Sequence, residues 1–421
     1  MRILVLGSGA REHAIVNALL AEDAGHKIVV APGNAGIAAQ VETLAMDPTD
    51  GVLVANYARD HRIDLVVVGP EAPLVAGVAD PIRRSGIPVF GPDRAAAALE
   101  GSKAFAKRIM ELAGVPTGRS VHASTLDEVA AALDDLGAPH VVKADGLAAG
   151  KGVIVTDDRD AALAHAEHYL QQGGVLIEEF LSGPEVSLFF FADGHDVLPL
   201  SPAQDYKRVG DGDTGANTGG MGAYSPLPWL DEDFGSEAAF VDEVRRTIAL
   251  PTIRALEAEG TPFRGLLYCG LVLTPTGIRV IEFNARFGDP ETQVVLPRMR
   301  TPLSGLLLAS AEGRLGGLPD PEFSDDVSVI VVLASEGYPE NPITGRELTG
   351  VDAPLPAGVT VTHAATARDG DRLLTTGGRV LGVVATGTDF ASARSAAYTV
   401  LDGIGLEGGH YRHDIAERVS P

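Results

Sequence analysis

The chain of 421 residues has a single cysteine, Cys269, and only 5% aromatic residues. One thiol cannot form an internal disulfide or a thiolate metal cluster, so we interpret Cys269 as a small buried apolar residue. No apolar run approaches the roughly 18 residues that a membrane-spanning helix needs. The apolar stretch at residues 3–6 is too short for a secretory signal peptide. These absences predict a soluble cytoplasmic protein without a membrane partner.

Basic residues are also scarce, because 33 Lys and Arg stand against 57 Asp and Glu, giving a net charge of −24. Such a chain repels nucleic-acid phosphates, so we expect no nucleic-acid partner. An anionic small molecule would need locally placed lysine, arginine or backbone N–H groups. Basic residues embedded in glycine-rich loops are therefore the first candidates for a site.

Short apolar strands alternate with helices over the first hundred residues. Apolar runs at 3–6, 28–31, 65–68 and 89–90 each lead into a turn with glycine or proline. Continuous apolar strands separated by helices predict a parallel sheet covered on both faces. Ligands of such sheets bind at the carboxyl ends of the strands.

The pattern changes after about residue 100. Residues 125–136 predict an amphipathic helix with a capping box of Thr125 and Glu128. We expect strands at 140–143, 153–156, 175–178, 328–334 and 379–385, a β-hairpin at 271–284 and a helix at 390–401. Residues 204–226 are polar, glycine-rich and without periodicity, which predicts a functional or a disordered loop. Residues 313–326 have the composition of a linker.

The turn Gly7-Ser8-Gly9 begins like a dinucleotide-binding fingerprint, but its sixth position is Glu12 rather than Gly or Ala. The second strand ends before Pro32, with no acidic residue to hold a ribose hydroxyl. An NAD-dependent oxidoreductase is therefore not favoured. The turn could still hold a phosphate on backbone N–H groups, or could be only a tight turn.

Residues 143–152 carry the strongest phosphate-binding pattern. Lys143 ends a predicted strand, and a loop with Gly146, Gly150 and Lys151 follows. It is not a Walker loop, because Gly152 stands where Ser or Thr would help to hold Mg²⁺. Metal ligands must therefore come from elsewhere, unless the segment is a glycine hairpin without a ligand.

Glu282 and Asn284 are candidate metal ligands, since residues two apart on a strand share a face. A carboxylate and an amide supply the hard oxygen atoms that suit Mg²⁺ bridging nucleotide phosphates. A solvent-facing polar alternation is the alternative. The charged residues Arg286, Asp289 and Glu291 follow directly, and this density favours a site.

Together these segments resemble the ATP-grasp superfamily, and most closely the phosphoribosylamine–glycine ligase family. The resemblance runs essentially end to end and departs at Ala216, where proline is usual, and at Ala416, where glycine is usual. The segments that carry it are GSGAREHA from Gly7, APGNAG from Ala31, VGPEAPLVAG from Val68, LEGSKAF from Leu99, VKADGLAAGKGV from Val142, QDYKRVGDGDTGANTGGMGAYSP from Gln204 and IEFNARFGDPETQ from Ile281.

The resemblance implies an α/β protein with the ATP-grasp fold. A Rossmann-like parallel-sheet domain (1–101) would precede an ATP-grasp domain (102–312) with a mobile lid subdomain (about 120–187) and a C-terminal α+β domain (325–421). The implied reaction joins glycine to 5-phosphoribosylamine via glycyl phosphate, with ATP as co-substrate and one or two Mg²⁺ or Mn²⁺ ions. The products would be glycinamide ribonucleotide, ADP and phosphate, in purine biosynthesis. We expect a monomer; another ATP-grasp carboxylate–amine ligase or a bicarbonate-using carboxylase is the alternative.

From the motifs and this resemblance we expect the following roles. ATP would be held by Lys103, Lys143, Gly146, Gly150, Lys151, Gly152, Glu178, Glu179, Leu181 and Glu185. Metal ions would be held by Glu282 and Asn284. Arg286, Lys143 and Asp289 would be catalytic, with Arg286 on the glycine carboxylate and Asp289 on its ammonium. Other substrate contacts would come from Gly9, Asn34, Gly36, Glu71, Asp205, Lys207, Gly219, Gly220 and Glu291.

Overall fold

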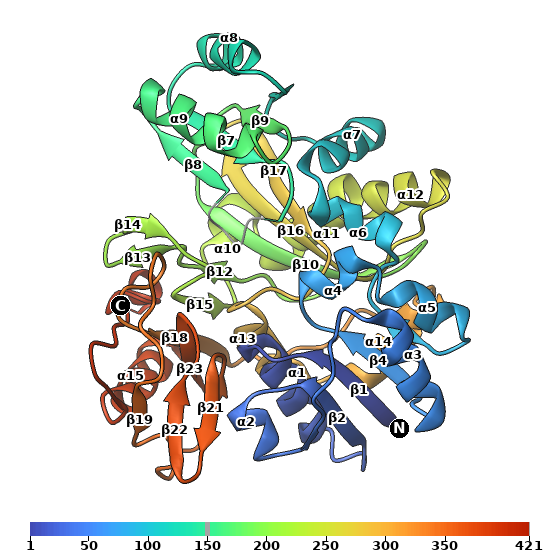
Figure 1. The fold of residues 1–421 in the computed structure, drawn as a ribbon, viewed down its shortest axis with the longest axis vertical. Coiled ribbons are helices and arrows are strands. Elements are labelled where there is room, and N and C mark those ends of the chain that lie inside the picture. Colours follow the sequence, from blue (N-terminus) through green and yellow to red (C-terminus); the bar gives the residue numbers. More distant parts are fainter. Residues whose placement is uncertain (148–151, 421) are drawn as a thin grey trace.

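The computed structural model of the chain describes residues 1–147 and 152–420 (Figure 1). Its N-terminal part is a five-stranded parallel sheet in the order β3-β2-β1-β4-β5. The strands are β1 (Arg2–Gly7), β2 (Lys27–Pro32), β3 (Glu42–Thr43), β4 (Leu65–Val68) and β5 (Val89–Phe90). The predicted parallel sheet is confirmed, and the short edge strand β3 is an addition to it.

Helices cover both faces of this sheet. Ile3 and Val5 of β1 join one buried cluster with residues of α1, whereas Leu4 and Leu6 join the other with residues of α3 and α5. This two-sided burial is the reason the strands read as continuous apolar runs. The helices of this part are α1 (Ala10–Ala21), α2 (Ala35–Ala38), α3 (Gly51–Asp60), α4 (Glu71–Ala76), α5 (Ala79–Arg84) and α6 (Arg94–Gly101).

The predicted lid region contains a separate antiparallel sheet, at the top of Figure 1, in the order β6-β9-β7-β8. Thr125 caps α8 and forms the predicted capping box with Glu128. Apolar residues of α8, α9 and the sheet form a small core of their own. The elements are β6 (Ser120–Ala123), α8 (Leu126–Leu136), β7 (His140–Ala144), β8 (Val153–Thr156), α9 (Arg159–Leu170) and β9 (Val175–Glu178).

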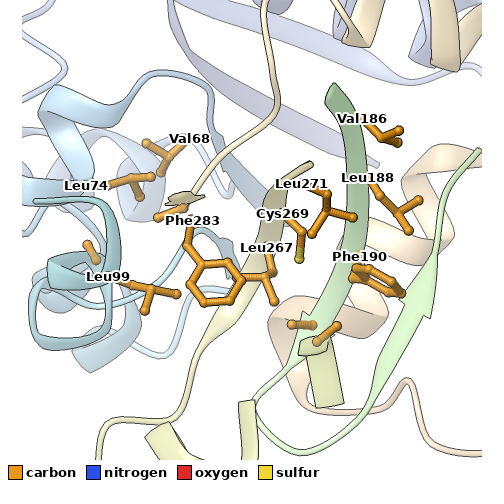
Figure 2. Close-up of a cluster of buried hydrophobic side chains, with 14 of the residues drawn as sticks. Val68, Leu74, Leu99, Val186, Leu188, Phe190, Leu267, Cys269, Leu271 and Phe283 are labelled. Atoms are coloured by element: carbon orange, nitrogen blue, oxygen red, sulfur yellow. The ribbon is translucent and has the colours of Figure 1, made fainter. Parts of the chain in front are cut away.

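The central sheet is antiparallel, in the order β11-β10-β16-β17, and includes the predicted hairpin as β16 and β17. Figure 2 shows Val186, Leu188 and Phe190 of β10 beside Leu267, Cys269 and Leu271 of β16. Cys269 is buried, as predicted. The elements are β10 (Glu185–Asp193), β11 (Val197–Pro199), β16 (Arg264–Thr274) and β17 (Gly277–Asn284), with α7 (Lys103–Ala113), α10 (Leu230–Phe234), α11 (Glu237–Val244), α12 (Leu250–Ala258), α13 (Thr292–Val295) and α14 (Leu303–Glu312).

The fourth large sheet joins the C-terminal part to residues 204–225, in the order β12-β15-β18-β23-β20. Strand β15 pairs with β18 from Gly222↔Val331 to Ser225↔Ser328. The segment 204–226 is therefore ordered, and the alternative of a disordered loop is wrong. The elements are β12 (Gln204–Asp205), β13 (Arg208–Gly210), β14 (Thr214–Asn217), β15 (Gly222–Ser225), β18 (Val327–Ala334), β20 (Val359–His363), β23 (Arg379–Gly387) and α15 (Phe390–Leu401).

A smaller sheet lies beside it, in the order β21-β22-β19-β24. Its strands are β19 (Glu347–Thr349), β21 (Thr366–Asp369), β22 (Arg372–Thr375) and β24 (Gly405–Leu406). In the two described ranges, no helix has both the length and the apolar character needed to cross a lipid bilayer.

Candidate active site

One cavity of about 450 Å³ collects most of the charged residues that the sequence singled out. Its walls come from the N-terminal part, the central and lid sheets, and the C-terminal part. Seven cationic and seven carboxylate side chains line it in the part of the chain that the structure describes. Local charge is thus balanced in a protein whose net charge is −24.

Two lysines and a glutamate meet where the lid sheet faces the central sheet. In the ladder of β7 and β9, Glu178 pairs with Val141, which puts Lys143 and Glu178 on one face. Lys143 Nζ donates to Glu178 Oε2 at 2.8 Å and to Ile281 O at 3.3 Å. Lys107 Nζ lies 3.4 Å from Glu178 Oε1, and burial lowers the pKa of Lys107 although Glu178 opposes the shift. The two lysines and the carboxylate that they share line one side of the cavity.

Lys103 lines the same cavity at the start of α7. Its backbone N–H donates to Asp145 Oδ1 at 2.6 Å, which ties the helix to the loop after β7. Gly146 and Gly152 also line the cavity. The predicted phosphate residues Gly150 and Lys151 lie outside the described residues.

Glu282 and Asn284 share one face of β17, as predicted from their spacing. Asn284 Nδ2 lies 3.4 Å from Glu282 Oε1, and both residues line the cavity. Burial would raise the pKa of Glu282, but the charges of Lys207, Lys143 and Lys103 outweigh burial and lower it. The carboxylate is therefore ionised. The amide oxygen of Asn284 faces Arg286 Nη2 at 3.5 Å, so it would have to turn toward Glu282 for the pair to hold a hard divalent cation.

No group of three or more His, Cys, Asp or Glu side chains suited to hold a metal ion is found among residues 1–147 and 152–420. A cation at Glu282 and Asn284 would therefore need further oxygen ligands, such as nucleotide phosphates and water.

Arg286 is held between two carboxylates from the N-terminal part. Its Nη2 lies 3.0 Å from Glu100 Oε1 and its Nε lies 3.4 Å from Glu71 Oε2. Glu100 also accepts the backbone N–H of Ala285 at 2.8 Å. Burial alone would lower the pKa of Arg286, but Glu100 and Glu71 raise it above its ordinary value. Arg286 is thus a permanent cation on the cavity wall, with 18% of its side chain exposed.

Asp205, Lys207 and Glu291 form a second charged group with Tyr268. Tyr268 Oη donates to Glu291 Oε1 at 2.6 Å, and Lys207 Nζ lies 3.9 Å from Asp205 Oδ1. Lys207 also forms a short ion pair with Glu185. Burial raises the pKa of Asp205 to about 7, with Glu291 adding to the rise and Lys207 opposing it.

The glycine turn before α1 already contains an anion. Gly9 N–H donates to Glu12 Oε2 at 2.6 Å, and Arg11 Nε lies 2.6 Å from Glu12 Oε1. A Cβ on Gly69 would lie only 2.1 Å from Glu12 Oε1, so the glutamate also fills the space beside β4. The position that favours a phosphate at a helix N-terminus is occupied by the protein's own carboxylate.

The predicted site residues divide into two sets by position. Those that line the cavity are Lys103, Lys143, Gly146, Gly152, Glu178, Asp205, Lys207, Gly219, Glu71, Glu282, Asn284, Arg286, Asp289 and Glu291. Those that do not line the cavity, as the described residues define it, are Gly9, Asn34, Gly36, Glu179, Leu181, Glu185 and Gly220.

Asn34 and Gly36 lie at the contact between the N-terminal and C-terminal parts. Asn34 Nδ2 donates to Ser8 O at 2.8 Å and to His363 O at 2.7 Å. A Cβ on Gly36 would lie 2.4 Å from His363 and 2.6 Å from His13. Both residues have a packing role in this structure.

Several cavity residues were missed by the sequence reasoning. They are Arg11, Glu100, Lys107, Thr218, Tyr268, Tyr338 and Arg379. Lys107 is the one that a local pattern could have indicated, because it follows Lys103 by one helical turn. Tyr338 and Arg379 reach the cavity only through tertiary packing of the C-terminal part.

Known proteins of one family match this chain over nearly its whole length. Three domain models of phosphoribosylglycinamide synthetase match: the N domain at residues 1–100, the ATP-grasp (A) domain at 101–292 and the C domain at 328–418. A phosphoribosylamine–glycine ligase of Leifsonia xyli is 67% identical, over 99% of this chain and 100% of the relative. One of Streptomyces coelicolor is 54% identical, over 100% of both chains.

Among solved structures, a phosphoribosylamine–glycine ligase from Thermotoga maritima superposes with a TM-score of 0.81 at 33% sequence identity. That match covers 98% of this chain and 100% of the Thermotoga chain. The predicted fold class, an ATP-grasp domain between an N-terminal parallel sheet and a C-terminal domain, is confirmed. The chain therefore belongs to the phosphoribosylamine–glycine ligase family of ATP-grasp enzymes.

Proposed function

We propose that this chain ligates glycine to 5-phosphoribosylamine at the expense of ATP, through a glycyl phosphate, to give glycinamide ribonucleotide, ADP and phosphate. The observation that carries the proposal is that one cavity gathers Lys103 and Lys143, the pair Glu282 and Asn284, and the pair Arg286 and Asp289. These are the groups needed for a triphosphate, a divalent cation and an amino acid. The membership of the family supports the same reaction.

We assign ATP to the side of the cavity where the lid and central sheets meet. Lys103, Lys143, Gly146 and Gly152, together with Gly150 and Lys151, would hold the phosphates. Glu178 would lie beside the base, with Glu179 and Leu181 flanking it. Glu185 remains our candidate for the ribose, although its ion pair with Lys207 would first have to open.

We assign a bound Mg²⁺ or Mn²⁺ to Glu282 and Asn284, with one or two ions completed by phosphate oxygens. When bound, such an ion neutralises charge on the transferring phosphoryl group. Lys143 and Arg286 would supply the protein's own share of that neutralisation. The side chains are 6% and 18% exposed, and a fixed charge that is largely shielded from water is worth more than one in bulk water.

In the first step, a carboxylate oxygen of glycine attacks the γ-phosphorus and the bond to ADP breaks. Arg286 would hold the glycine carboxylate in line, and Asp289 would accept hydrogen bonds from the ammonium group. Arg286 is suited to this role because Glu71 and Glu100 fix its orientation at 3.4 Å and 3.0 Å. Positioning of this kind accounts for most of the catalysis in phosphoryl transfer.

In the second step, the amine of phosphoribosylamine attacks the acyl carbon, and inorganic phosphate leaves as the C–N bond forms. The amine must also lose a proton. We assign that proton to Asp205, a carboxylate on the cavity wall, because burial raises its pKa and a raised pKa makes a carboxylate a better proton acceptor. Lys207 and Glu291 lie beside it.

We place the phosphoribosyl group between the N-terminal part and the 204–226 loop, near Gly9, Asn34, Gly36 and Glu71, with Gly219 and Gly220 closing over it. Gly9 and Asn34 donate to protein oxygen atoms in this structure, so these bonds would have to exchange for substrate contacts. We also propose a cytoplasmic monomer divided at 1–101, 102–312 and 325–421, with a lid at about 120–187.

The test is ADP release by the full-length chain with glycine, with and without phosphoribosylamine, against the same assay with bicarbonate. We expect ADP and glycinamide ribonucleotide with glycine and phosphoribosylamine together. Phosphoribosylamine-dependent ADP release with bicarbonate and none with glycine would instead identify an ATP-grasp carboxylase.

A further inference from the structure

Arg379, the first residue of β23, reaches from the C-terminal sheet to the cavity wall. Its Nη1 donates to Gly219 O at 2.6 Å and to Asp289 O at 2.8 Å. Its Nη2 lies 3.2 Å from Asp289 Oδ2, and only 20% of the side chain is exposed. One guanidinium therefore joins the main chain and carboxylate of Asp289 to the 204–226 loop.

The two glycines of the loop are needed for this close approach. A Cβ on Gly219 would lie 3.0 Å from Arg379 Cζ, and one on Gly220 would lie 2.4 Å from Pro290 Cδ. Gly220 also has a φ of 108°, which other residues rarely adopt. A second C-terminal residue, Tyr338, accepts the N–H of Gly219 at 3.0 Å through its hydroxyl. The glycine pair is thus fixed by the C-terminal part.

We propose that Arg379 is a positioning residue for the glycine substrate, because it holds Asp289 and the Gly219–Gly220 peptides in the arrangement that receives the substrate's ammonium group. The proposal rests on the proposed role of Asp289. It extends that role to a residue 90 positions away along the chain, in a domain that carries none of the predicted catalytic groups.

The chemistry of the contacts supports an arginine here and not a lysine. A planar guanidinium can bridge three oxygen atoms in fixed directions, whereas an ammonium group cannot span them. Its charge also acts on the carboxylate. Burial would raise the pKa of Asp289, but Arg379 and then Arg11 outweigh burial, so that the pKa is lowered and the group stays ionised.

Direct contact of Arg379 with the phosphoribosyl substrate is the competing role. Both Nη atoms face protein oxygens at 2.6 to 3.2 Å, so the guanidinium is already committed within the protein. The two roles predict that substitution of Arg379 raises the KM of different substrates. A positioning role through Asp289 acts on glycine, whereas a phosphate contact acts on phosphoribosylamine.

The experiment compares full-length wild type with Arg379→Lys and Arg379→Met, with KM measured separately for glycine, phosphoribosylamine and ATP. We expect the KM for glycine to rise roughly ten- to a hundredfold, the range for loss of a charged hydrogen bond. The KM for ATP should stay within about twofold, since the side-chain partners of Arg379 among the described residues are Gly219, Gly220 and Asp289, none of which we assign to the nucleotide. If the Met variant does not fold, the Lys variant, which keeps the charge, supplies the comparison.

Arg298→Lys is the matched control. Arg298 is also buried and donates to Ser201 Oγ at 2.6 Å, Ser225 Oγ at 2.7 Å and Asp326 O at 2.6 Å, but it does not line the cavity as described. We expect this change to lower the melting temperature and to leave the KM for glycine unaltered. In a double-mutant cycle, Arg379→Met should add little to Asp289→Asn in the KM for glycine.

Two outcomes would overturn the proposal. A raised KM for phosphoribosylamine with an unchanged KM for glycine would make Arg379 a substrate contact. A lowered melting temperature with all three KM values unchanged would make it a purely structural residue. A wild-type chain that releases no ADP with glycine and phosphoribosylamine would instead refute the proposed function, whatever the variants do.

Discussion

Two buried histidines join α1 to β20, and they make the stability of this contact depend on pH. The rings of His13 and His363 lie 5.7 Å apart, with exposures of 1% and 8%. His13 Nδ1 accepts the backbone N–H of His363 at 2.9 Å, so that nitrogen cannot take up a proton without losing the bond. Burial lowers the pKa of His13 to about 3 and that of His363 to about 4.

The two lowered pKa values determine how stability changes with pH. Both histidines stay neutral in the fold down to about pH 5, whereas in the unfolded chain they take up protons below about pH 6.5. Acid therefore favours the unfolded state, and stability falls as pH drops below that value. Below about pH 6.5 each histidine costs about 1.4 kcal/mol per pH unit, so the pair removes about 4 kcal/mol between about pH 6.5 and pH 5 and almost nothing between pH 7.5 and pH 6.5.

The assay is urea unfolding of the wild type and of His363→Gln at pH 7.5 and pH 5. Other groups titrate in this range, so the informative quantity is the difference between the two proteins. We expect the variant to lose about 2 kcal/mol less on acidification than the wild type, because one of the two histidines is gone. His61→Gln, at an exposed histidine stacked on Tyr57, should behave as the wild type does. An equal loss in wild type and His363→Gln would refute the reasoning.

Three further predictions concern the site. Glu282→Ala should abolish turnover but weaken ATP binding much less, with ATP binding measured by equilibrium dialysis. Near-normal turnover at modest Mg²⁺ would show that this residue is not the metal ligand. Gly220→Ala should lower both the melting temperature and turnover, because the added Cβ would lie 2.4 Å from Pro290 Cδ. Gly212→Ala is the control: its φ is 64° and no described atom lies within 4 Å of an added Cβ, so it should cost only local backbone strain. Equal effects of the two changes would show that the clash with Pro290 is not the cause. Glu12→Gln should destabilise the fold by about 1.5–3 kcal/mol in urea, since it weakens charged hydrogen bonds to Gly9 and Arg11; an unchanged midpoint would contradict this.

Local signals predicted much of the fold. The capping box at Thr125 and Glu128 fixed the start of α8, and the apolar run at 65–68 appears unchanged as β4. Both depend on interactions within a few residues, or on burial so complete that it leaves a continuous apolar run. The segment 204–226 lacked such a signal, because β15 is formed by pairing with β18, about a hundred residues further along the chain.

Site residues could likewise be predicted where a local pattern exists, and not where tertiary packing brings them to the cavity. Glu282 and Asn284 share a face because strand side chains alternate, which is a local rule. Arg379 has no local pattern at all, because its role depends on where β23 meets the loop and Asp289. The sequence shows that the turn at Gly7 departs from the dinucleotide-binding fingerprint at Glu12. Only the structure shows that the Glu12 carboxylate occupies the turn.

The pairing of β15 with β18 also sets the order in which the protein can mature on the ribosome. At roughly 5–20 residues per second, synthesis takes about 5–20 s to proceed from Ser225 to Val327. During that time β15 has no partner on the edge that later pairs with β18, and an unpaired strand edge is a template for association between nascent chains. A fragment that ends at residue 312 would keep this edge open permanently. The last hundred residues therefore complete the cavity wall through Arg379 and also cover an edge that would otherwise promote aggregation.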